Sequence, residues 1–325
     1  MALVRKRLSI CVASLAAVAV IGIGASWRPD KTVEELRGRW AASPSQFVSV
    51  GDLQVHLRDE GPRSDSVPIV LLHGTSASLH TWEGWAGALR GQRRVIRMDL
   101  PGFGLTGPNA TDDYSVDSYV RMVVELLDRL GVRRFVIAGN SLGGQVAWSL
   151  AFAHPQRVER MILVDASGYD PTSGTQEQVL PLGFHLARTP VVKRVAEYAL
   201  PRFVVERSVR SAYGDPDKVT AQLVDLYEDM ALRAGNRRAL VRRIEQGYVG
   251  DPLHIQKIAV PTLIIWGGKD RIVPLEFGKR FERNIKNSRL VVFEDLGHTP
   301  QEEDPARTVA VVRRFLDLGE RAALN

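Results

Sequence analysis

Cysteine is almost absent from this sequence of 325 residues. The single cysteine, Cys11, lies in an apolar N-terminal stretch, so the rest of the chain can form no disulfide and offers no thiol nucleophile or thiolate metal ligand. The sequence also lacks the GxxxxGK[ST] pattern of phosphate-binding loops and the HExxH pattern of zinc proteases. We therefore expect no metal ion and no cofactor, and a fold stabilised by its apolar core.

An excess of charge of one sign is absent as well. The net charge is +6, and it falls to +3 (6 − 3) without Arg5, Lys6 and Arg7, because residues 1–27 contain no acid to balance them. Residues 166–259 carry 13 Lys and Arg against 11 Asp and Glu. Since no segment forms the basic block typical of nucleic-acid-binding proteins, we predict no nucleic-acid partner.

The N-terminus contains a stretch without any charge, from Leu8 to Ser26. A membrane-spanning helix needs about 20 apolar residues and a signal-peptide core usually has up to about 15, so the length favours an uncleaved anchor. Cleavage after the small residues 24–26 remains the alternative for this signal anchor or signal peptide, residues 1–27. The basic residues before it predict export: the chain is anchored in the membrane through residues 8–26 with its main domain outside the cytoplasm, or it is secreted.

The middle of the sequence predicts an α/β fold. Residues 28–45 are polar and are interpreted as a stalk or linker that needs no core; FVSV and LQVHLRDEG then predict two strands joined at Gly51 and Asp52. From Pro68 onward, apolar runs alternate with amphipathic segments such as residues 115–131. This alternation is typical of a mostly parallel sheet flanked by helices on both faces.

The alternation stops between Asp165 and Pro261, where the sequence shows helical patterns but no strand. One helix is predicted over 217–235, with Asp215 in its N-terminal cap and Gly235 at its end. An unstructured loop of this length is rare in a compact domain, so residues 166–259 are predicted to form a helical cap inserted after the sixth strand. The core would then consist of residues 46–165 and 260–320.

The sequence GNSLGG, residues 139–144, lies between the apolar run FVIA and a helix-compatible run. A G-x-S-x-G turn between strand and helix holds its serine in a strained backbone conformation and exposes the hydroxyl above the sheet. The following helix directs its first N–H groups and positive dipole end toward charge that forms at Ser141. The context favours a nucleophile over a simple glycine turn.

A serine hydroxyl needs a base to remove its proton, so Ser141 requires a histidine and an acid. Asp270 follows the strand TLIIW and His298 follows RLVVFED, which places both in loops beyond strand ends. The chain order serine, aspartate, histidine is the one expected in this architecture. Asp165 also follows a strand and is the second choice for the acid, whereas Asp99 is assigned to the tight turn DLPGFG.

An acyl-transfer intermediate carries an oxyanion that needs two preorganised N–H donors. The candidates are the N–H of Leu142, directly after the serine, and the N–H of Thr75 in the loop HGTS. His73 is interpreted as a brace for that loop, and the other five histidines have structural explanations. Residues 102–107 match G-x-G-x-x-G, but a turn-rich segment follows them instead of a helix, so we predict no dinucleotide site.

The segments HGTSAS, DLPGFG, GNSLGG, GGKDRIVP and GHTPQEEDP occur in this order, and together they resemble the α/β-hydrolase family from about Phe47 to the C-terminus. The resemblance implies a nucleophile, base, acid and oxyanion hole formed by Ser141, His298, Asp270, Thr75 and Leu142. It also implies that residues 166–259 shape substrate choice. Serine at position 141, in the turn that this family uses as its nucleophile elbow, argues against the dehalogenase and epoxide hydrolase branches, which have aspartate there.

We expect a carboxylesterase-like serine hydrolase that cleaves an ester or lactone of a small to medium apolar molecule through an acyl-enzyme on Ser141. GNSxGG also resembles hydrolases that cleave carbon–carbon bonds in ring-cleavage products, although HGTSAS departs from their HGGGPG-like loop. A third hypothesis is a membrane-tethered protein that binds apolar ligands without turnover, against which Asp270 and His298 argue. Substrate identity and oligomeric state stay open.

Overall fold

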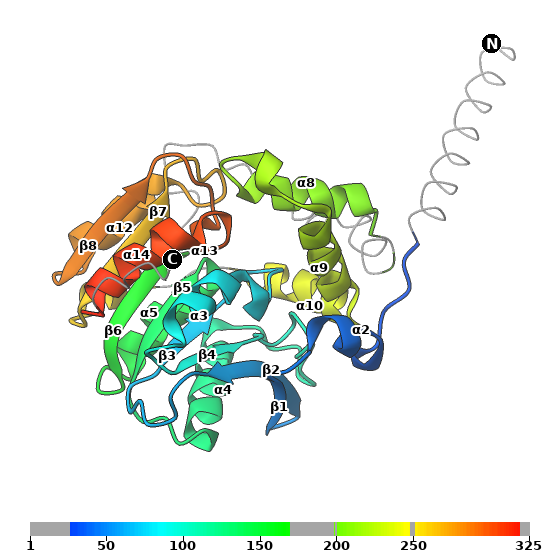
Figure 1. Cartoon of the computed structure of the whole chain (residues 1–325), viewed down its shortest axis with the longest axis horizontal. Coiled ribbons are helices and arrows are strands. Elements are labelled where there is room, and N and C mark those ends of the chain that lie inside the picture. The colour runs from blue at the N-terminus through cyan, green and yellow to red at the C-terminus, as the bar shows by residue number, and fades with distance from the viewer. Residues whose placement is uncertain (1–26, 170–197, 199, 248–250, 319–325) are drawn as a thin grey trace, which may run out of the picture.

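The computed structural model of this chain describes residues 27–169, 198, 200–247 and 251–318. An eight-stranded sheet forms the centre of the described part, with the strand order β1-β2-β4-β3-β5-β6-β7-β8 (Figure 1). The strands are β1 Ser45–Val50, β2 Leu53–Glu60, β3 Ile69–Leu72, β4 Val95–Met98, β5 Phe135–Asn140, β6 Val158–Val164, β7 Thr262–Gly267 and β8 Ser288–Phe293.

Only the first strands of the sheet run antiparallel. β1 and β2 form the predicted hairpin around Gly51, with Val50 paired to Leu53, and β2 also pairs antiparallel with β4. All the remaining neighbours pair in parallel. The predicted mostly parallel α/β sheet is therefore confirmed.

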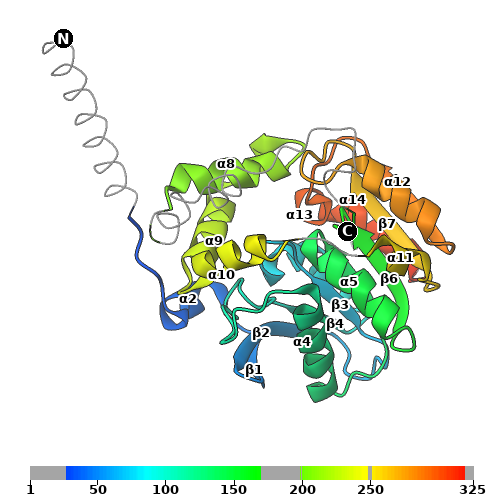
Figure 2. The same cartoon turned by 180° about the vertical axis from the view of Figure 1, so that it is seen from behind.

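Helices cover both faces of the sheet, as the two opposite views show (Figures 1 and 2). α3 and α14 pack on one face, and α4, α5 and α12 pack on the other. The helices of the described residues are α2 Val33–Trp40, η1 Leu79–Trp82, α3 Glu83–Leu89, α4 Val116–Arg129, α5 Leu142–Ala153, α8 Arg202–Ala212, η3 Pro216–Lys218, α9 Ala221–Leu232, α10 Asn236–Glu245, α11 Pro252–Gln256, α12 Leu275–Asn284, α13 Pro300–Glu303 and α14 Pro305–Phe315.

Strand β3 shows why continuous apolar runs suit this sheet. Its four residues are completely buried: Ile69 and Leu71 contact the layer with α3 and α14, and Val70 and Leu72 contact the opposite layer. Successive side chains of a strand point to opposite faces, so a strand covered on both faces needs apolar residues throughout. The parallel strands end at one edge of the sheet, and their loops meet there.

The described residues between β6 and β7 are helical, in the order α8, η3, α9, α10 and α11. The single helix predicted over 217–235 is wrong in its bounds. Asp215 caps only the short turn η3, Thr220 caps the separate helix α9, and Gly235, with φ 85°, precedes α10. The cap bounds 166–259 stay a prediction, because residues 170–197 and 248–250 lie outside the described residues.

Residues 28–45 are not the core-free stalk that their polarity suggested. Helix α2 buries Leu36 and Trp40 in a cluster that it shares with α9, and the two helices lie side by side in both views (Figures 1 and 2). The indole Nε1 of Trp40 donates to Asp229 at 2.8 Å, and Lys31 forms an ion pair with the same carboxylate at 2.5 Å. Two apolar residues spaced i, i+4 suffice to attach one face of a short polar helix.

The predicted membrane-directed segment, residues 8–26, lies outside the described residues. Within the described residues, every helix is too short or too polar to cross a lipid bilayer. The anchor therefore stays a prediction.

Candidate active site

Ser141 occupies the sharp turn between β5 and α5. Its backbone has φ 53° and ψ −115°, which is strained for any residue except glycine and typical of functional turns. The turn is tight enough that a Cβ on Gly139 would lie 2.1 Å from the carbonyl oxygen of Gly143. β5 continues to Asn140, two residues beyond its expected end at Ala138. The strand–turn–helix context predicted from GNSLGG is present.

Hydrogen bonds hold this turn against the neighbouring strand loops. The N–H of Ser141 donates to the carbonyl of Val164 at 3.1 Å, and the N–H of Ser167 donates to the carbonyl of Ser141 at 3.1 Å. The buried side-chain amide of Asn140 donates to Val164 at 3.1 Å and to the carbonyl of His298 at 2.9 Å. Asn140 thus joins the serine turn to the histidine loop. The motif allows any residue at this position, so only adjacency to Ser141 pointed to it.

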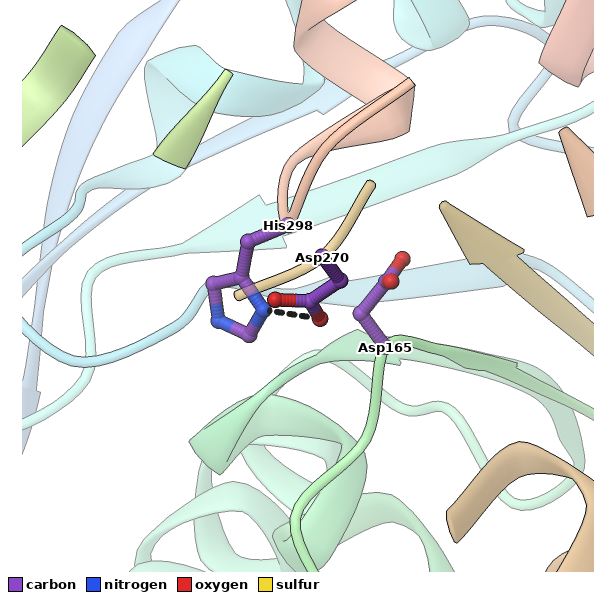
Figure 3. Close-up of side chains that lie close together, drawn as sticks. All are labelled: Asp165, Asp270 and His298. Atoms are coloured by element: carbon purple, nitrogen blue, oxygen red, sulfur yellow. Dashed lines mark hydrogen bonds and ion pairs between the residues drawn. The ribbon is translucent and has the colours of Figure 1, made fainter. Parts of the chain in front are cut away.

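Asp270 and His298 are brought together at the ends of β7 and β8 (Figure 3). His298 Nδ1 and Asp270 Oδ2 are 2.7 Å apart. The other carboxylate oxygen of Asp270 accepts the N–H of Ile272 at 2.7 Å and of Val273 at 3.0 Å. The Asp270 side chain is fully buried, while that of His298 is 8% exposed. An Nδ1–H bound to a carboxylate leaves Nε2 as the basic nitrogen.

Asp165, the second choice for the acid, lies behind this pair (Figure 3). It follows β6 and is completely buried, and its Oδ1 accepts the N–H of Gly267 at 2.9 Å. Burial raises the pKa of Asp165 well above its usual value, and the nearby Asp270 carboxylate raises it further. Asp270, and not Asp165, is the acid that bonds to the histidine ring.

Asp165, Asp270 and His298 are also the group of described residues whose ligand atoms could surround a metal ion, since these atoms lie within 4.8 Å of one another. Their geometry serves hydrogen bonding instead. His298 Nδ1 and Asp270 Oδ2 already bond to each other, and the free Asp165 oxygen is buried behind them.

The loop after β3 lies directly against the serine turn. A Cβ on Gly74 would be 3.1 Å from the Cβ of Ser141 and 2.9 Å from the side-chain oxygen of Asn140, so a larger residue would press on the serine turn. This contact brings the loop that contains Thr75 against the serine turn. Leu142 is the first residue of α5, where the N–H has no partner within the helix. The roles of the Thr75 and Leu142 N–H groups as oxyanion donors stay a prediction.

His73 braces the Gly74 loop, as its position in the sequence suggested. Its Nδ1 bonds to the carbonyl of Gly74 at 2.7 Å, and its Nε2 accepts the N–H of Leu100 at 2.9 Å. Complete burial lowers the pKa of His73, which keeps the ring neutral. Both ring nitrogens of His73 are hydrogen-bonded, so neither is free to act as a base in catalysis.

The glycine-rich segment 102–107 surrounds a second histidine–aspartate pair. Asp99 Oδ2 bonds to His56 Nδ1 at 2.7 Å and accepts the N–H of Leu105 at 2.7 Å. No helix follows this segment, which the sequence also indicated. The glycines thus wrap a buried aspartate of the fold. The spacing of the sequence offered no signal for the His56–Asp99 pair.

The inserted helices are tied to the histidine loop. The N–H of His298 donates to the carbonyl of Ala212, the last residue of α8, at 2.7 Å. Glu303 accepts the backbone N–H groups of Gly214, Asp215 and Gly297 at 2.8 to 2.9 Å. These bonds make α8 part of the frame that positions the histidine.

A second carboxyl of this loop bonds to two tyrosines of the inserted helices. Tyr213 and Tyr227 donate their hydroxyls to Glu302 at 2.7 and 3.2 Å. Burial raises the pKa of Glu302. The motif GHTPQEEDP located this loop, but not the tyrosines that its glutamates meet.

Comparison with known proteins places the site in context. Residues 67–305 match the family model described as alpha/beta hydrolase fold. The chain is 36% identical to an uncharacterised protein of Mycobacterium tuberculosis over 264 residues, which cover 78% of this chain and 76% of that protein. It is 29% identical to the 2-hydroxy-6-oxo-2,4-heptadienoate hydrolase of Pseudomonas putida, over 85% of this chain and 97% of that enzyme.

Two kinds of solved structure are similar in fold. A membrane phospholipase A, described as a bacterial virulence factor, superposes with a TM-score of 0.74 and 25% identity, over 99% of this chain and 100% of the other. A meta-cleavage product hydrolase superposes with a TM-score of 0.71 and 26% identity, over 84% of this chain and 98% of the other. The names of the two neighbours denote different activities on one fold.

Proposed function

The chain belongs to the alpha/beta hydrolase fold family, and from that premise we propose that it is a serine hydrolase that cleaves a carboxylic ester or lactone of an apolar molecule through an acyl-enzyme on Ser141. One observation carries the proposal. The turn that holds the strained Ser141 is hydrogen-bonded through Asn140 to the loop of a histidine, His298. The Nδ1 of this histidine is bonded to a buried aspartate, and no hydrogen bond of the described residues occupies its Nε2. This is the arrangement that nucleophilic catalysis by serine requires.

In the proposed reaction, His298 Nε2 removes the hydroxyl proton of Ser141 while the oxygen attacks the ester carbonyl. Asp270 holds the ring in the tautomer with Nδ1–H and stabilises the imidazolium that forms. The N–H groups of Thr75 and Leu142 bind the oxyanion of the tetrahedral intermediate, each worth about 3 to 4 kcal/mol in the transition state. The imidazolium then gives its proton to the departing alcohol.

Hydrolysis of the acyl-enzyme repeats these steps with water. His298 Nε2 takes a proton from the water molecule, the hydroxide attacks the acyl carbonyl, and Ser141 leaves with the proton that His298 returns. The products are the carboxylic acid and the regenerated hydroxyl. Apart from the substrate and this water molecule, the bond changes use only groups of the chain.

Two observations favour an ester as the substrate. The predicted oxyanion loop has the sequence HGTS, in which Thr75 carries a side chain. Ring-cleavage hydrolases have an HGGGPG-like run at this place. One neighbour that spans both chains almost completely is a phospholipase, a name that denotes an ester hydrolase. We therefore favour an ester with an apolar acyl chain, supplied at a membrane.

We further propose that residues 8–26 anchor the enzyme, with the catalytic domain outside the cytoplasm, or that they are removed and the enzyme is secreted. The uncharged length of this segment and the basic residues before it support export. The name of the membrane phospholipase neighbour agrees with an anchored form. Sequencing the N-terminus of protein from a membrane fraction distinguishes the two forms.

Mutation of Ser141 to alanine tests the nucleophile. We expect S141A to lower p-nitrophenyl ester turnover by at least about a thousandfold and to abolish labelling by a fluorophosphonate. Ser149, on the same helix α5, provides the matched control, and S149A should be labelled and active. Turnover that survives in S141A would contradict the proposal, and a wild-type protein that is neither labelled nor active would favour a binding protein.

Carbon–carbon bond hydrolysis is the second candidate, because several curated relatives at 28–30% identity bear names of such hydrolases. A panel of p-nitrophenyl esters of increasing chain length, run beside a ring-cleavage dienone, separates the two activities. We expect kcat/KM for the best ester to exceed that for the dienone by at least about tenfold. The opposite ratio would mean that the substrate is a dienone and not an ester, and the roles of Ser141 and His298 would be unchanged.

A further inference from the structure

Asp165 is a buried acid for which the proposed reaction has no use. It stands directly after β6 with φ 44°, a left-handed conformation that few residues other than glycine adopt. Its N–H donates to the carbonyl of Ile265 at 3.0 Å, and the whole residue is inaccessible to solvent. A carboxyl at a strained and fully buried position needs a physical reason to be there.

The hydrogen bonds of Asp165 are incomplete. Oδ1 accepts the N–H of Gly267, whereas Oδ2 is buried and has no hydrogen-bond partner among the described residues. Carboxylate oxygens of Asp165 and Asp270 lie within 4.8 Å of each other and of His298 Nδ1 or Nε2. Figure 3 shows Asp270 between His298 and Asp165. Two ionised carboxylates in such a dry site repel each other strongly, so the pair holds one proton.

The donors around each carboxyl decide where that proton resides. Asp270 receives three hydrogen bonds, from the N–H groups of Ile272 and Val273 and from His298, and these stabilise its negative charge. Asp165 receives one, from Gly267. Hydrogen bonds to the charged form favour ionisation, so the carboxyl with fewer donors keeps the proton.

We propose that Asp165 is a positioning residue whose protonated carboxyl donates a hydrogen bond to the Asp270 carboxylate and so holds the acid in place for His298. The proposal rests on the proposed function, since it takes Asp270 as the acid of the triad. Three donors already surround Asp270 on the side of its own loop and the histidine. Asp165 adds a fourth from β6, the strand whose following residues also bond to Ser141.

The electrostatic surroundings agree with a neutral Asp165. Burial raises its pKa, the charge of Asp270 raises it further, and the N–H of Gly267 opposes both. The titratable groups that face it are Asp270 after β7, His298 after β8 and Glu303 on α13, whose charge raises the pKa again. An ionised Asp165 would place a second negative charge beside Asp270 and displace it from the histidine.

Asp165→Asn tests the proposal because asparagine copies the protonated acid. Its Oδ1 can accept the N–H of Gly267 while its amide donates to Asp270. We expect D165N to keep kcat/KM within about threefold of wild type, and D165L, which can do neither, to lose about tenfold or more in kcat with KM unchanged. A D165N variant as impaired as D165L would overturn the proposal.

The pH profile distinguishes positioning from simple packing. We expect the acid limb of the fluorophosphonate labelling rate to be the same for D165N and wild type, because both are neutral at position 165. The wild-type rate should decline once the pH exceeds the raised pKa of Asp165, and the D165N rate should not. An acid limb displaced by about one pH unit in D165N would mean that Asp165 is ionised in the wild type and would refute the proposal.

Infrared difference spectra provide a readout that needs no substrate. The spectrum of wild type minus D165N at neutral pH should contain the carbonyl band of a protonated carboxylic acid, and that of wild type minus D99N should not, because Asp99 is a buried aspartate with a lowered pKa. Absence of the band in the first difference would overturn the proposal. If Ser141 proves unreactive, the proposed function fails, yet the band still determines the protonation of Asp165.

Discussion

Two histidine–aspartate pairs lie in this molecule with the same contact distance. His298 and Asp270 join at 2.7 Å near the ends of β7 and β8, and His56 and Asp99 join at 2.7 Å between β2 and the end of β4. In both pairs Nδ1 faces the aspartate. In both pairs, two backbone N–H groups also donate hydrogen bonds to the aspartate carboxylate.

The pairs differ at the far nitrogen of the ring. His56 Nε2 bonds to the hydroxyl of Ser45 at 2.9 Å, and the side chain is completely buried against the ring of Phe47. No hydrogen bond among the described residues occupies His298 Nε2, and the side-chain amide of Asn140, next to Ser141, donates to the carbonyl of His298. An Asp–His contact thus does not by itself mark a catalytic site; a histidine can act as a base only when its second nitrogen is available.

Removing each imidazole should have opposite consequences, and this is the largest expected effect. H298A should lower kcat/KM by about 10⁴-fold or more while the free energy of unfolding changes little. H56A should lower the free energy of unfolding by about 3 kcal/mol, because the completely buried ring packs against Phe47 and bonds to both Asp99 and Ser45. It should keep kcat per folded molecule. Ester turnover and urea denaturation of both variants check the prediction. A folded H56A variant with lost turnover would remove the distinction between the pairs.

Neutralising each acid sharpens the same contrast. D270N should reduce kcat by about 10³- to 10⁴-fold, since an amide favours the wrong tautomer of His298, with the unfolding midpoint nearly unchanged. D99N should cost about 2 kcal/mol of stability and little kcat. The steady-state rates and denaturation midpoints are measured in parallel. Comparable losses of kcat in the two variants would mean that the pairs are not functionally separate.

The sequence indicated one pair and missed the other for a physical reason. Asp270 and His298 both follow strands of a parallel sheet, and the carboxyl ends of such strands meet at one edge, so position along the chain predicted their proximity. His56 lies within the antiparallel β2, and its partner depends on the register between β2 and β4, in which Leu57 is opposite Met98. No motif specifies that register.

The same distinction applies to the fold as a whole. Strand and helix order followed from apolar periodicity, because each strand such as β3 is buried on both faces. The bond that attaches helix α2 joins Trp40 to Asp229, which are 189 positions apart. The bonds from Tyr213 and Tyr227 to Glu302 join residues 89 and 75 positions apart. Local patterns carry no information about which distant side chains meet.

The pH dependence of stability should come from the His56–Asp99 pair. Burial acts to raise the pKa of Asp99, but the electrostatic interaction and the hydrogen bond with His56 lower it below its usual value. A depressed folded-state pKa gives stability that is present above the unfolded pKa of about 3.9 and is lost as pH falls below it. Wild type should therefore lose of the order of 2 kcal/mol between pH 5 and acid unfolding that D99N does not lose. Urea denaturation at a series of pH values tests this, and parallel slopes would contradict it.

The smallest expected effect comes from removing the hydrogen-bond partner of His56 Nε2. S45A removes the hydroxyl that bonds to His56 Nε2 and to Arg58, and it should cost about 1 kcal/mol of stability. The ring should nevertheless stay unreactive toward diethylpyrocarbonate, while His298 reacts, because His56 is also completely buried. Tryptic mapping of the modified histidines provides the measurement. If His56 of S45A became as reactive as His298, the hydrogen bond alone would keep it inert; if it stayed unmodified, burial would separate the two pairs even where their hydrogen bonding is made alike.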